Sequence, residues 1–541
     1  MEREDKILVA LFLVSFLALA LLIRLSMPNF MPVIVESRLF FQLLLAASVI
    51  ALLRNCVGIS TYGVFGPAII AFGLLSPGPL WGVALYVNVL VLALAVRFII
   101  EPLRIPNAYR VALLISVFGI FVSLAEVVGE LYHMSILQAS LLFPALITSW
   151  MADRFANNVR EIGWREPAIK LLATFLLVLV SWAVISNIPL VIWFIENPEM
   201  WAILIGFNIL LATKWRFRLL EYLRFDWVLR KQPPSDVLSM NVRNREYIEE
   251  YNPRHLFPGL EKAEMKKAMH GLGISTPETY LILSEKRQLG RLRELLTGRD
   301  KFVIKPNVSY GGEGIIVVTG KKGGRYASAS GKTYGIQELT GHAAQIMDGQ
   351  YSSELWDSAI VEALVVAHPF FSGISSGGVP DIRVIVFKGF PLMAMTRLPT
   401  RESGGEANLH KGAVGVGLEL HTGKAVTAFS NKLGHIKKHP DTGAPLEGVV
   451  MPGWRGILEL AVKAHYASRL GYSGVDIVVD KDKGPMVLEV NKRPGLGIQN
   501  ANLEGLLRRL RFVEGKLAEV EHLPLEKKVD LVMEWSEKGW R

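Results

Sequence analysis

Apolar and polar positions divide the chain into two halves with different patterns. Up to about residue 213, long apolar runs follow one another with few charges between them. After that point, short β-branched runs alternate with glycine turns and charged, helix-like stretches. Runs of roughly 20 apolar residues are long enough to cross a bilayer as helices, whereas short alternating runs are typical of strands. The pattern therefore predicts a membrane half followed by a soluble half.

The first half contains eight apolar runs that we interpret as transmembrane helices. They lie at about residues 7–25, 39–54, 59–76, 80–100, 109–130, 135–151, 168–187 and 199–213. The alternative for the first run is a cleaved signal peptide. Its start, MEREDK, is not strongly positive and no small-residue cleavage site follows, so we favour a retained helix.

Lys and Arg residues between the runs predict the orientation, because basic loops stay in the cytoplasm. With eight spans, the basic clusters after the second, fourth, sixth and eighth runs fall on one side. The loops after the third, fifth and seventh runs have no Lys or Arg, and only Arg24 and Arg38 break the rule. This places both termini and the soluble half on the cytoplasmic side of the inner (cytoplasmic) membrane.

Carboxylates inside the predicted spans are candidates for function, because an acidic side chain at mid-bilayer costs about 2.5 to 3.5 kcal/mol. Glu126 and Glu130 lie towards the outer end of their run, and Asp153 lies just past the end of its own. We interpret these three as side chains that reach the membrane surface. Polar residues that would line an ion or proton path are scarce, which disfavours an ATP-driven transporter.

The net charge of +10 is concentrated beside the spans. Residues 215–236, WRFRLLEYLRFDWVLRKQPPSD, form either the positive cytoplasmic flank of the last span or a helix on anionic lipid. No RNA-binding signature accompanies them, so we expect lipid and no nucleic acid as a partner. The only cysteine, Cys56, lies in the apolar half, which excludes disulfides from the soluble half. We divide the chain into a membrane domain (1–213), a basic linker (214–258) and a soluble domain (259–541).

A first candidate site lies in residues 302–318, FVIKPNVSYGGEGIIVV. Successive backbone N–H groups of a glycine-rich turn form an anion-binding nest, and Lys305 adds a positive charge, so the segment suits a phosphate. A plain glycine hairpin with a surface lysine remains the alternative. The GKT sequence at 331–333 is not a Walker A loop, because residue 326 is Tyr instead of Gly.

A second candidate site lies in residues 471–495, GYSGVDIVVDKDKGPMVLEVNKRPG. Two strands joined by a turn carry Asp476 on the first strand, and Glu489 and Asn491 two positions apart on the second. Residues two apart on a strand share a face, so three oxygen donors can converge, as Mg²⁺ requires beside nucleotide phosphates. A solvated hairpin face explains the turn residues but not Glu489 and Asn491, which lie among apolar neighbours.

The order of these motifs resembles the ATP-grasp superfamily, in particular its α-L-glutamate-ligase-like members, from about residue 260 to 515. Between the two sites lie AIVEALVV (359–366), VPDIRVIVFKG (379–389), MAMTRLPT (393–400) and EANLHKGAVGVG (406–417). The resemblance implies an α+β ATP-grasp domain that uses ATP and Mg²⁺, or Mn²⁺ in its place. It also implies ligation of a carboxylate to an amine through an acyl phosphate, with an amino acid or a peptide as substrate.

The resemblance also assigns roles to individual residues. Those expected at the nucleotide are Lys305, Ser309, Gly311, Gly312 and Gly314 for the phosphates, Glu362, Ala363 and Leu364 for adenine, and Asp381 and Asn408. Those expected to bind metal are Asp476, Glu489 and Asn491. Arg383 and Arg397 match basic residues near the transferred phosphoryl group. The ordinary alternatives are strand-edge charges for the arginines, a turn cap for Asp381 and a structural role for His410.

Some features depart from glutamate ligases. The large substrate-binding domain that precedes the grasp domain in those enzymes is absent before residue 259. The segment NKRPG, with Lys492 and Arg493, resembles instead the NxRPG of ATP-grasp proteins linked to sugar transfer. His435, His439 and Asp441 are a second metal-ligand candidate, but HPDTG (439–443) favours a structured turn.

The membrane half resembles a seven-helix module that is also found fused to an inactive transglutaminase-like protein, with one extra helix here. That resemblance suggests a membrane transglutaminase-like protein as a partner. Two other classes of function remain open: a nucleotide-binding regulator without ligase activity, and an ATP-driven transporter. The first would bind ATP and Mg²⁺ without forming ADP, and the second would need polar residues through the bundle.

Overall fold

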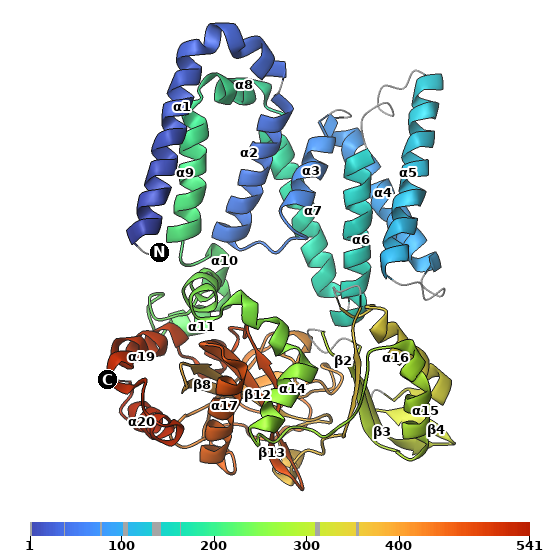
Figure 1. Ribbon diagram of the computed structural model, residues 1–541, viewed down its shortest axis with the longest axis vertical. Helices are drawn as coiled ribbons and strands as arrows, with labels where there is room; N and C mark the ends of the chain where they lie inside the picture. The colour runs from blue at the N-terminus through green and yellow to red at the C-terminus, as the bar shows by residue number, and fades with distance from the viewer. Residues whose placement is uncertain are drawn as a thin grey trace. The chain divides into compact units, whose positions relative to one another are not determined.

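The computed structural model contains two compact units, Met1–Glu221 and Tyr222–Arg541, which are described separately (Figure 1). The structure describes residues 3–36, 38–75, 78–100, 107–132, 142–162, 164–308, 314–329, 331–352 and 356–540.

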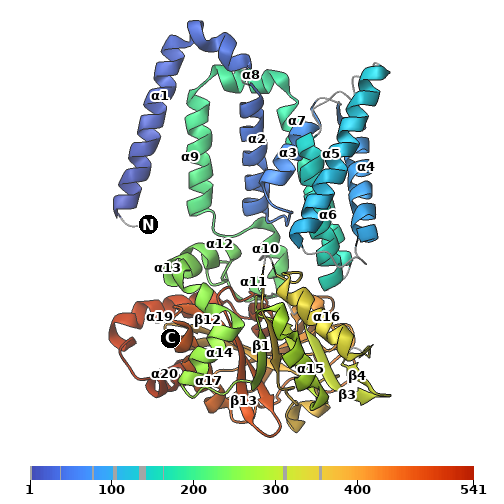
Figure 2. The ribbon, with the colours of Figure 1, turned by 45° about the vertical axis from the view of Figure 1, so that its right-hand side comes forward.

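Among its described residues, the first unit contains helices and no strands. Its helices are α1 (Arg3–Glu36), α2 (Arg38–Leu52) with the π-helix η1 (Leu53–Val57), α3 (Phe65–Gly73), α4 (Gly78–Ile100), α5 (Asn107–Leu131), α6 (Leu142–Ile162), α7 (Arg165–Ile185), α8 (Ile188–Glu196) and α9 (Glu199–Lys214) (Figure 2). Among the described residues, three segments are long and apolar enough to cross a membrane: Arg38–Val57, Ala112–Leu131 and Arg165–Ile185. A pair bent by 99°, α8 with the helix from Glu199, makes a fourth if it counts as one span. A count of eight spans therefore stays a prediction.

The third predicted span, 59–76, is wrong as a continuous helix. Only the nine residues of α3 are helical there, and at about 1.5 Å per residue they reach less than half of the roughly 30 Å of hydrocarbon. Gly58 and Gly63 have φ angles of +99° and +91°, which stop a helix before α3. The backbone is satisfied inside the protein instead, since the Tyr62 N–H donates to Thr174 Oγ1 at 3.1 Å.

Asp153 does not lie past the end of its helix, as the predicted span at 135–151 had it. Helix α6 continues through Ile162, so Asp153 lies inside it, and its carboxylate accepts a hydrogen bond from Arg97 Nε at 3.0 Å. Both side chains are buried, which a charge in an apolar surrounding tolerates only when it is paired. On α5, Glu126 is half-buried and Glu130 is exposed.

The second unit starts with short helices that pack onto its two sheets. They are α10 (Leu219–Arg224, which begins before the boundary), α11 (Asp226–Leu229), α12 (Met240–Val242), η3 (Arg243–Ile248), α13 (Glu249–Tyr251), η4 (Arg254–Leu256), η5 (Pro258–Leu260) and α14 (Lys262–Gly271). Phe225, Val228 and Tyr247 are buried in this unit. Much of the predicted linker is therefore folded, because its apolar residues find a sheet and helices to pack against.

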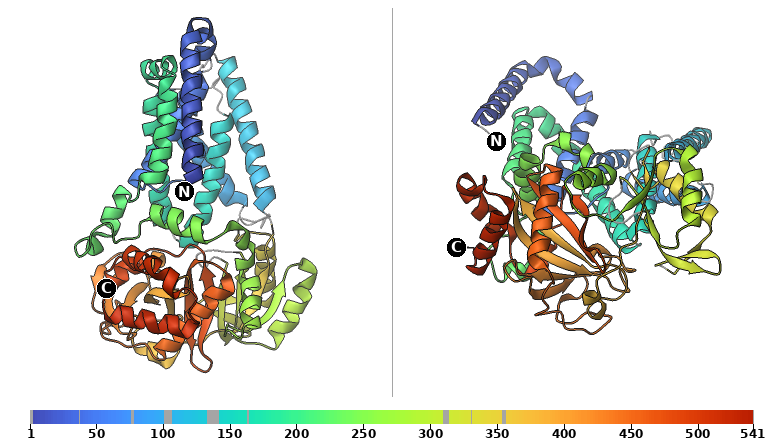
Figure 3. Two further views of the ribbon diagram at one scale, coloured as in Figure 1. Left: turned by 60° about the vertical axis from the view of Figure 1, so that its left-hand side comes forward. Right: turned by 60° about the horizontal axis from the view of Figure 1, so that its bottom comes forward.

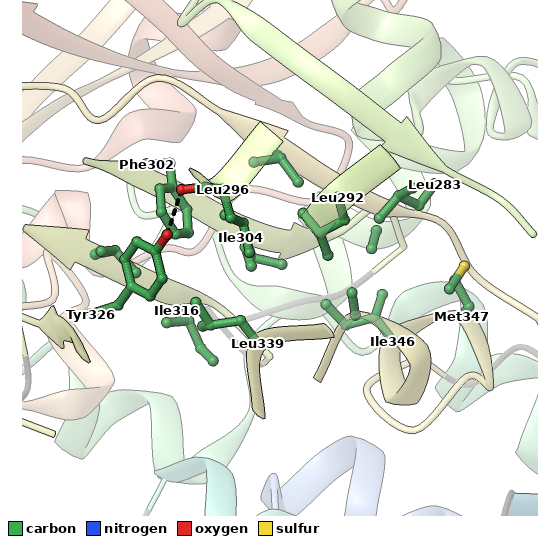
Figure 4. Packing of buried hydrophobic residues seen from close by; sticks show 14 residues of the cluster. Leu283, Leu292, Leu296, Phe302, Ile304, Ile316, Tyr326, Leu339, Ile346 and Met347 are labelled. Atoms are coloured by element: carbon green, nitrogen blue, oxygen red, sulfur yellow. Dashed lines mark hydrogen bonds between the residues drawn. The ribbon is translucent and has the colours of Figure 1, made fainter. Parts of the chain in front are cut away.

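A six-stranded antiparallel sheet forms the first layer of this unit. Its strands are β1 (Thr279–Leu283), β2 (Phe302–Pro306), β3 (Ile316–Lys322), β4 (Arg325–Ser328), β5 (Thr333–Tyr334) and β6 (Ala359–Glu362), in the order β1-β6-β2-β3-β4-β5. Helices α15 (Leu289–Thr297) and α16 (Ile336–Met347) pack their apolar sides on it, around Phe302, Ile304 and Leu339 (Figure 4). The GKT sequence lies at the end of the antiparallel strands β3 to β5.

A seven-stranded antiparallel sheet forms the larger part of the unit (Figure 3). Its strands are β7 (Asp381–Phe387), β8 (Phe390–Leu398), β9 (Val414–Leu418), β10 (Ala425–Ser430), β11 (Gly434–Ile436), β12 (Tyr472–Asp480) and β13 (Gly484–Asn491), in the order β11-β10-β9-β8-β7-β12-β13. Helices α17 (Trp454–Ser468), α18 (Ile498–Asn502), α19 (Leu506–Val520) and α20 (Leu525–Glu537) pack against it. The α+β class predicted for the soluble half is confirmed.

A buried histidine in this packing gives a pH-dependent stability. His465 on α17 is buried, and its Nδ1 lies 2.7 Å from Ser473 Oγ. Burial, with Lys528 and Lys388 nearby, lowers the pKa of His465 to about 3. Since the unfolded chain takes up this proton near pH 6.5 and the folded chain does not, stability is present above pH 6.5 and is lost as the pH falls towards 3.

We expect His465→Asn to lower the thermal midpoint of the full chain at pH 7, because it leaves a small cavity, and to flatten its decline between pH 6.5 and 4. His465 makes the folding equilibrium constant fall by nearly tenfold per pH unit in this range, and His465→Asn removes that dependence. His255→Gln, at an exposed position, is the matched control and leaves the decline unchanged. An unchanged decline in His465→Asn would show that His465 does not carry it.

Candidate functional site

Strand register brings five charged side chains together on one face of the seven-stranded sheet. Asp381 on β7 lies opposite Arg397 on β8, and Arg383 on β7 lies opposite Asp476 on β12. Asp476 in turn lies opposite Glu489 on β13. Opposite residues of antiparallel strands point to the same side, as do Asp381 and Arg383, two apart on one strand. A polar row therefore crosses four adjacent strands.

Two arginines hold the carboxylates of this row. Arg383 binds Asp476 with two hydrogen bonds, Nε to Oδ1 at 2.7 Å and Nη2 to Oδ2 at 2.6 Å. Arg397 donates from Nε to Asp381 Oδ1 at 2.7 Å, and its Nη2 contacts both Asp381 Oδ2 and, at 2.8 Å, Asp476 Oδ2. Such paired N–H···O contacts fix the guanidinium planes.

Asp381, Asp476 and Arg397 are buried, while Arg383 and Glu489 are half-buried, and the charges of the row depend on one another. Burial by itself raises the pKa of Asp476, but Arg383 and Arg397 outweigh burial and hold this pKa at about 2. Burial raises the pKa of Asp381 to about 6, which Arg397 offsets only in part. Burial disfavours the charged form of Arg397, yet the two aspartates raise its pKa above the usual value. Arg397 therefore stays charged.

The three predicted metal ligands converge beside this row. Asn491 Nδ2 donates to Asp476 Oδ2 and to Glu489 Oε1, each at 3.1 Å. Among the described residues, no group of three His, Cys, Asp or Glu side chains is arranged to hold a metal. The metal role of these three residues stays a prediction. Asp476 already accepts four hydrogen bonds, whereas Glu489 accepts one.

A second charged cluster is built on the six-stranded sheet. Glu362 at the end of β6 accepts from Lys305 Nζ on β2 at 2.6 Å and also pairs with Lys266 on α14. All three are buried. Burial raises the pKa of Glu362, but Lys305 and Lys266 outweigh it and leave this pKa lowered. Burial and the neighbouring Lys305 lower the pKa of Lys266 to about 8.

The sequence reasoning missed Lys262 and Lys266 on α14. Lys262 Nζ lies 3.4 Å from the carbonyl oxygen of Asn307, directly after β2. Burial lowers the pKa of Lys262. The negative charge of Glu489, on the other sheet, raises this pKa in part, and the positive charge of Lys305 lowers it. Lys262 therefore lies between the two clusters. Two lysines four apart on an amphipathic helix share a face, which was the available signal.

The predicted phosphate loop is fixed at both ends. Ser309, Gly311 and Gly312 lie outside the described residues. Before them, the Val308 N–H donates to Asp357 Oδ1 at 3.1 Å. After them, Gly314 has a φ of +68°, and a Cβ there would lie 2.6 Å from Tyr351 Cγ, so only glycine fits. The carbonyl of Gly314 accepts from His342 Nε2 at 2.8 Å.

Other predicted residues have structural contacts. The Ala363 N–H donates to the carbonyl of Glu278 at 2.8 Å, so it is already used, and Leu364 follows β6 half-buried. Asn408 caps η8 (Leu409–Lys411) by accepting from the His410 N–H at 3.0 Å, and it makes no contact with either cluster in the described part of the chain. The adenine role predicted for Ala363 and Leu364, and the nucleotide role predicted for Asn408, stay predictions.

The loop with His439 is a structured turn, as predicted. His439 is buried, its Nε2 lies 3.0 Å from the carbonyl oxygen of Pro399, and its Nδ1 accepts from the Asp441 N–H at 3.3 Å. Asp441 Oδ2 accepts from the Arg401 N–H at 2.8 Å. His435 packs against the Trp227 ring, with 5.1 Å between centroids. These side chains support the turn and do not converge on a metal position.

Two known families match parts of this chain. Residues 242–515, just over half of the chain, match the family described as sugar-transfer associated ATP-grasp. The chain belongs to this family. The NKRPG segment at 491–495 had pointed to this branch. Residues 10–229 match a region described as 7 transmembrane helices usually fused to an inactive transglutaminase, so this ATP-grasp protein has an N-terminal helical region of the seven-transmembrane type.

Among solved structures, the chain is similar to the following proteins at low sequence identity and low TM-score. The ATP-grasp ligase PsnB, complexed with a minimal precursor, is 14% identical over 48% of this chain and 60% of its own, with a TM-score of 0.26. D-alanine–D-alanine ligase from Bacillus anthracis is 18% identical over 52% and 67%, with a TM-score of 0.27. D-cycloserine synthetase DcsG is 15% identical over 48% and 71%, with a TM-score of 0.28. No curated protein sequence matches the chain.

The lysine cluster can be tested by removing its central charge. We expect Glu362→Gln to destabilise the second unit by about 3 kcal/mol, because two buried lysines lose their shared partner. The pKa of Lys266 is about 8, so Lys266 can lose its proton once Glu362 is removed. We therefore expect a loss of stability at the lower end of the range for broken buried ion pairs. The measurement is the thermal midpoint of the nucleotide-free full chain.

The matched control is Glu264→Gln, which removes one partner of the exposed Lys267–Glu264 pair on the same helix. Exposed pairs contribute little, so its midpoint stays near that of the parent. Equal midpoints for Glu362→Gln and Glu264→Gln would contradict the role given to Glu362.

Proposed function

We propose that this protein is a membrane-anchored, ATP- and Mg²⁺-dependent ligase that joins a carboxylate to an amine through an acyl phosphate. The observation that carries the proposal is the polar row on the seven-stranded sheet, with Glu489 and Asn491 at one end and two arginines fixed by aspartates behind them. Lys262 and Lys305 supply positive charge from the other cluster. Anionic phosphates and a cation are the ligands that such an arrangement suits.

The nucleotide is bound by the lysine cluster and the loop at 309–314. Lys305 and Lys262 are cationic groups close to the anchored ends of that loop. An ammonium acts as a point charge on phosphate, and backbone N–H groups of a glycine-rich turn add hydrogen bonds. Glu362 keeps Lys305 in place while the phosphate is absent.

The donor set fits a magnesium ion. Glu489 and Asn491 offer carboxylate and amide oxygens, the ligand types that Mg²⁺ takes together with phosphate oxygens and water. Asp476 adds negative charge beside them, although its oxygens are occupied by N–H groups. When bound, the ion supplies neutralisation of the phosphate charge. Mn²⁺ accepts the same ligands.

Arg383 and Arg397 stabilise charge on the transferred group. Each arginine uses Nε and Nη2 for the aspartates, and Nη1 of each makes no hydrogen bond within the described residues. These Nη1 groups are held rigidly and remain able to donate. Preorganised donors of this kind are a large part of catalysis when charge builds on oxygen, and losing one typically costs about 10² to 10³ in rate.

The proposed reaction has two steps. A carboxylate oxygen of the first substrate attacks the γ-phosphorus of ATP, the bond to the β–γ bridging oxygen breaks, and an acyl phosphate and ADP form. The amine of the second substrate then attacks the acyl carbon, phosphate leaves with the C–O bond electrons, and the amine nitrogen loses a proton. The products are an amide, ADP and phosphate, with an amino acid or a peptide as one substrate.

The cellular setting belongs to the same proposal. Basic residues between the apolar runs place the ATP-grasp domain on the cytoplasmic side of the inner membrane. The match of residues 10–229 to a region usually fused to an inactive transglutaminase supports a transglutaminase-like membrane protein as a partner. The main alternative is a regulator that binds ATP and Mg²⁺ on the same residues without ligation.

Metal binding is tested first because it needs no knowledge of the substrates. We expect ATP with Mg²⁺ to raise the thermal midpoint of the full chain, and Glu489→Ala and Asn491→Ala to abolish the part of this rise that depends on Mg²⁺. Asp482→Ala, on the exposed β12–β13 turn, keeps the parent's response. If both site variants respond like the parent, the metal assignment is wrong.

Phosphate binding is tested by a pair of lysine variants. Lys305→Met should weaken ATP binding by about tenfold to a hundredfold, the loss expected when one charge-assisted hydrogen bond is removed. Lys321→Met, on the adjacent strand β3 where the lysine pairs with Asp300, leaves the affinity unchanged. Affinity is measured by titrating a fluorescent ATP analogue, and equal affinities for the two variants contradict the role of Lys305.

Ligation itself is tested by product mass. The full chain is incubated with ATP, Mg²⁺ and pairs of amino acids or peptides, and we expect amide products together with ADP and phosphate from at least one pair. Arg397→Lys should lower this rate by at least 10² with the product unchanged. Tight ATP binding without ADP from any pair would favour the regulator.

A further inference from the structure

An apolar and basic surface of the second unit is not used by the proposed chemistry. Leu223 on α10 is 76% exposed, which is the highest value for a large apolar side chain in the described part of this unit. Trp227 on α11 is 43% exposed, and Leu433, in the turn between β10 and β11, is 58% exposed. We call these three side chains, with the basic residues around them, the Leu433 surface.

This surface joins two segments that are about 200 positions apart in the sequence. The Trp227 ring contacts the His435 ring. Trp227 Nε1 also lies 3.8 Å from the point where a Cβ atom on Gly434 would lie, and Gly434 is the neighbour of Leu433. On the other side of the same segment, Phe225 and Val228 are fully buried. The segment is therefore fixed to the domain by one apolar side while it exposes another.

The charge around the three apolar side chains is positive. The basic residues are Arg224, Arg230, Lys231 and Lys432. Two exposed acidic residues pair with members of this group, Asp226 with Arg230 at 2.6 Å and Glu402 with Lys432 at 3.3 Å. Four positive charges against two negative ones leave the surface cationic. Arg230 also lies over the Trp227 ring, 4.9 Å from its centroid.

We infer that the Leu433 surface binds the anionic head-group layer of the membrane. Leucine and tryptophan side chains next to Lys and Arg are the composition that inserts into the interface of a bilayer while the charges meet anionic lipid. Tyr222 lies only eight residues after Lys214, the last residue of α9. A segment this short limits how far the chain can move away from the end of α9. A flat protein partner would need a larger apolar core than three separated side chains.

The inference goes beyond the proposed function, because it concerns how the catalytic unit is held against lipid and not what it ligates. The turn with Leu433 is the informative part. A tether alone brings residues near 222 close to lipid, whereas contact at residue 433 requires that this face of the domain lies on the bilayer.

Site-specific fluorescence tests the inference in the full chain. In a Cys56→Ser background, which removes the only cysteine, an environment-sensitive dye is attached at Leu433→Cys, and at Leu223→Cys as a second position. The control label is at Asp482→Cys, in the β12–β13 turn at the opposite edge of the same sheet. Nanodiscs that hold one copy contain phosphatidylglycerol and a lipid with a spin label near its head group.

We expect the spin-labelled lipid to quench the dye at 433 at least twofold more than the dye at 482, and to do so less in discs of phosphatidylcholine alone. Lys231→Glu with Lys432→Glu should reduce quenching at 433 to the control level, whereas Lys481→Glu with Lys483→Glu should not. The response of the thermal midpoint to ATP stays that of the parent in both double variants, which shows that the catalytic unit is folded.

Three results would overturn the inference. The first is equal quenching at 433 and 482, which means that this face does not contact lipid. The second is strong quenching at 433 that is the same in phosphatidylcholine, which contradicts recognition of anionic head groups. The third is a blue-shifted dye at 433 without lipid quenching, which means that protein covers the surface instead.

Discussion

The pairing of buried charge constrains the whole catalytic unit. Asp381, Asp476, Arg383 and Arg397 lie on one face of a sheet whose intervening residues, such as Ile382 and Ile477, are fully buried. An unpaired charge in such a place costs several kcal/mol, so the strands must keep the register that sets each carboxylate opposite its arginine. A shift by one residue would send all of these side chains to the other face. The register that the fold needs is thus the register that builds the site.

In the lysine cluster, positive charges outnumber negative ones. Two lysines share one carboxylate, and Lys262 adds a third positive charge with a lowered pKa. In the proposed function, phosphates would balance the positive charge of this cluster, whereas the polar row next to Glu489 and Asn491 would take a cation. Each sheet would then bind a different part of a metal-bound nucleotide.

Local patterns predicted the strands and the converging donors, because residues two apart on a strand must share a face and a short charged turn must join β12 to β13. They did not predict the pairing across strands that places Arg383 and Arg397 on the aspartates. The contacts with Asp476 depend on register between segments 79 and 93 residues apart, and the contact of Arg397 with Asp381, 16 residues away, depends on the register of β7 with β8. Lys262 and Lys266 were missed because burial of a lysine is decided by the sheet that covers it. In the membrane half, apolar content alone predicted a third helix. Gly58 and Gly63, with positive φ angles, interrupt the helix there, and Thr174 on a distant helix accepts a hydrogen bond from the backbone N–H of Tyr62.

The occupancy of Asp476 has a consequence for how metal and arginine share the site. A carboxylate has about four lone-pair positions, and Asp476 already accepts four hydrogen bonds, three of them from guanidinium groups. A cation that takes one of its oxygens must displace at least one N–H. If Arg397 is displaced, it keeps Asp381 as a partner, whereas Arg383 has no second aspartate among its hydrogen-bond partners. Arg397 is therefore the arginine that can release Asp476 at the smaller cost.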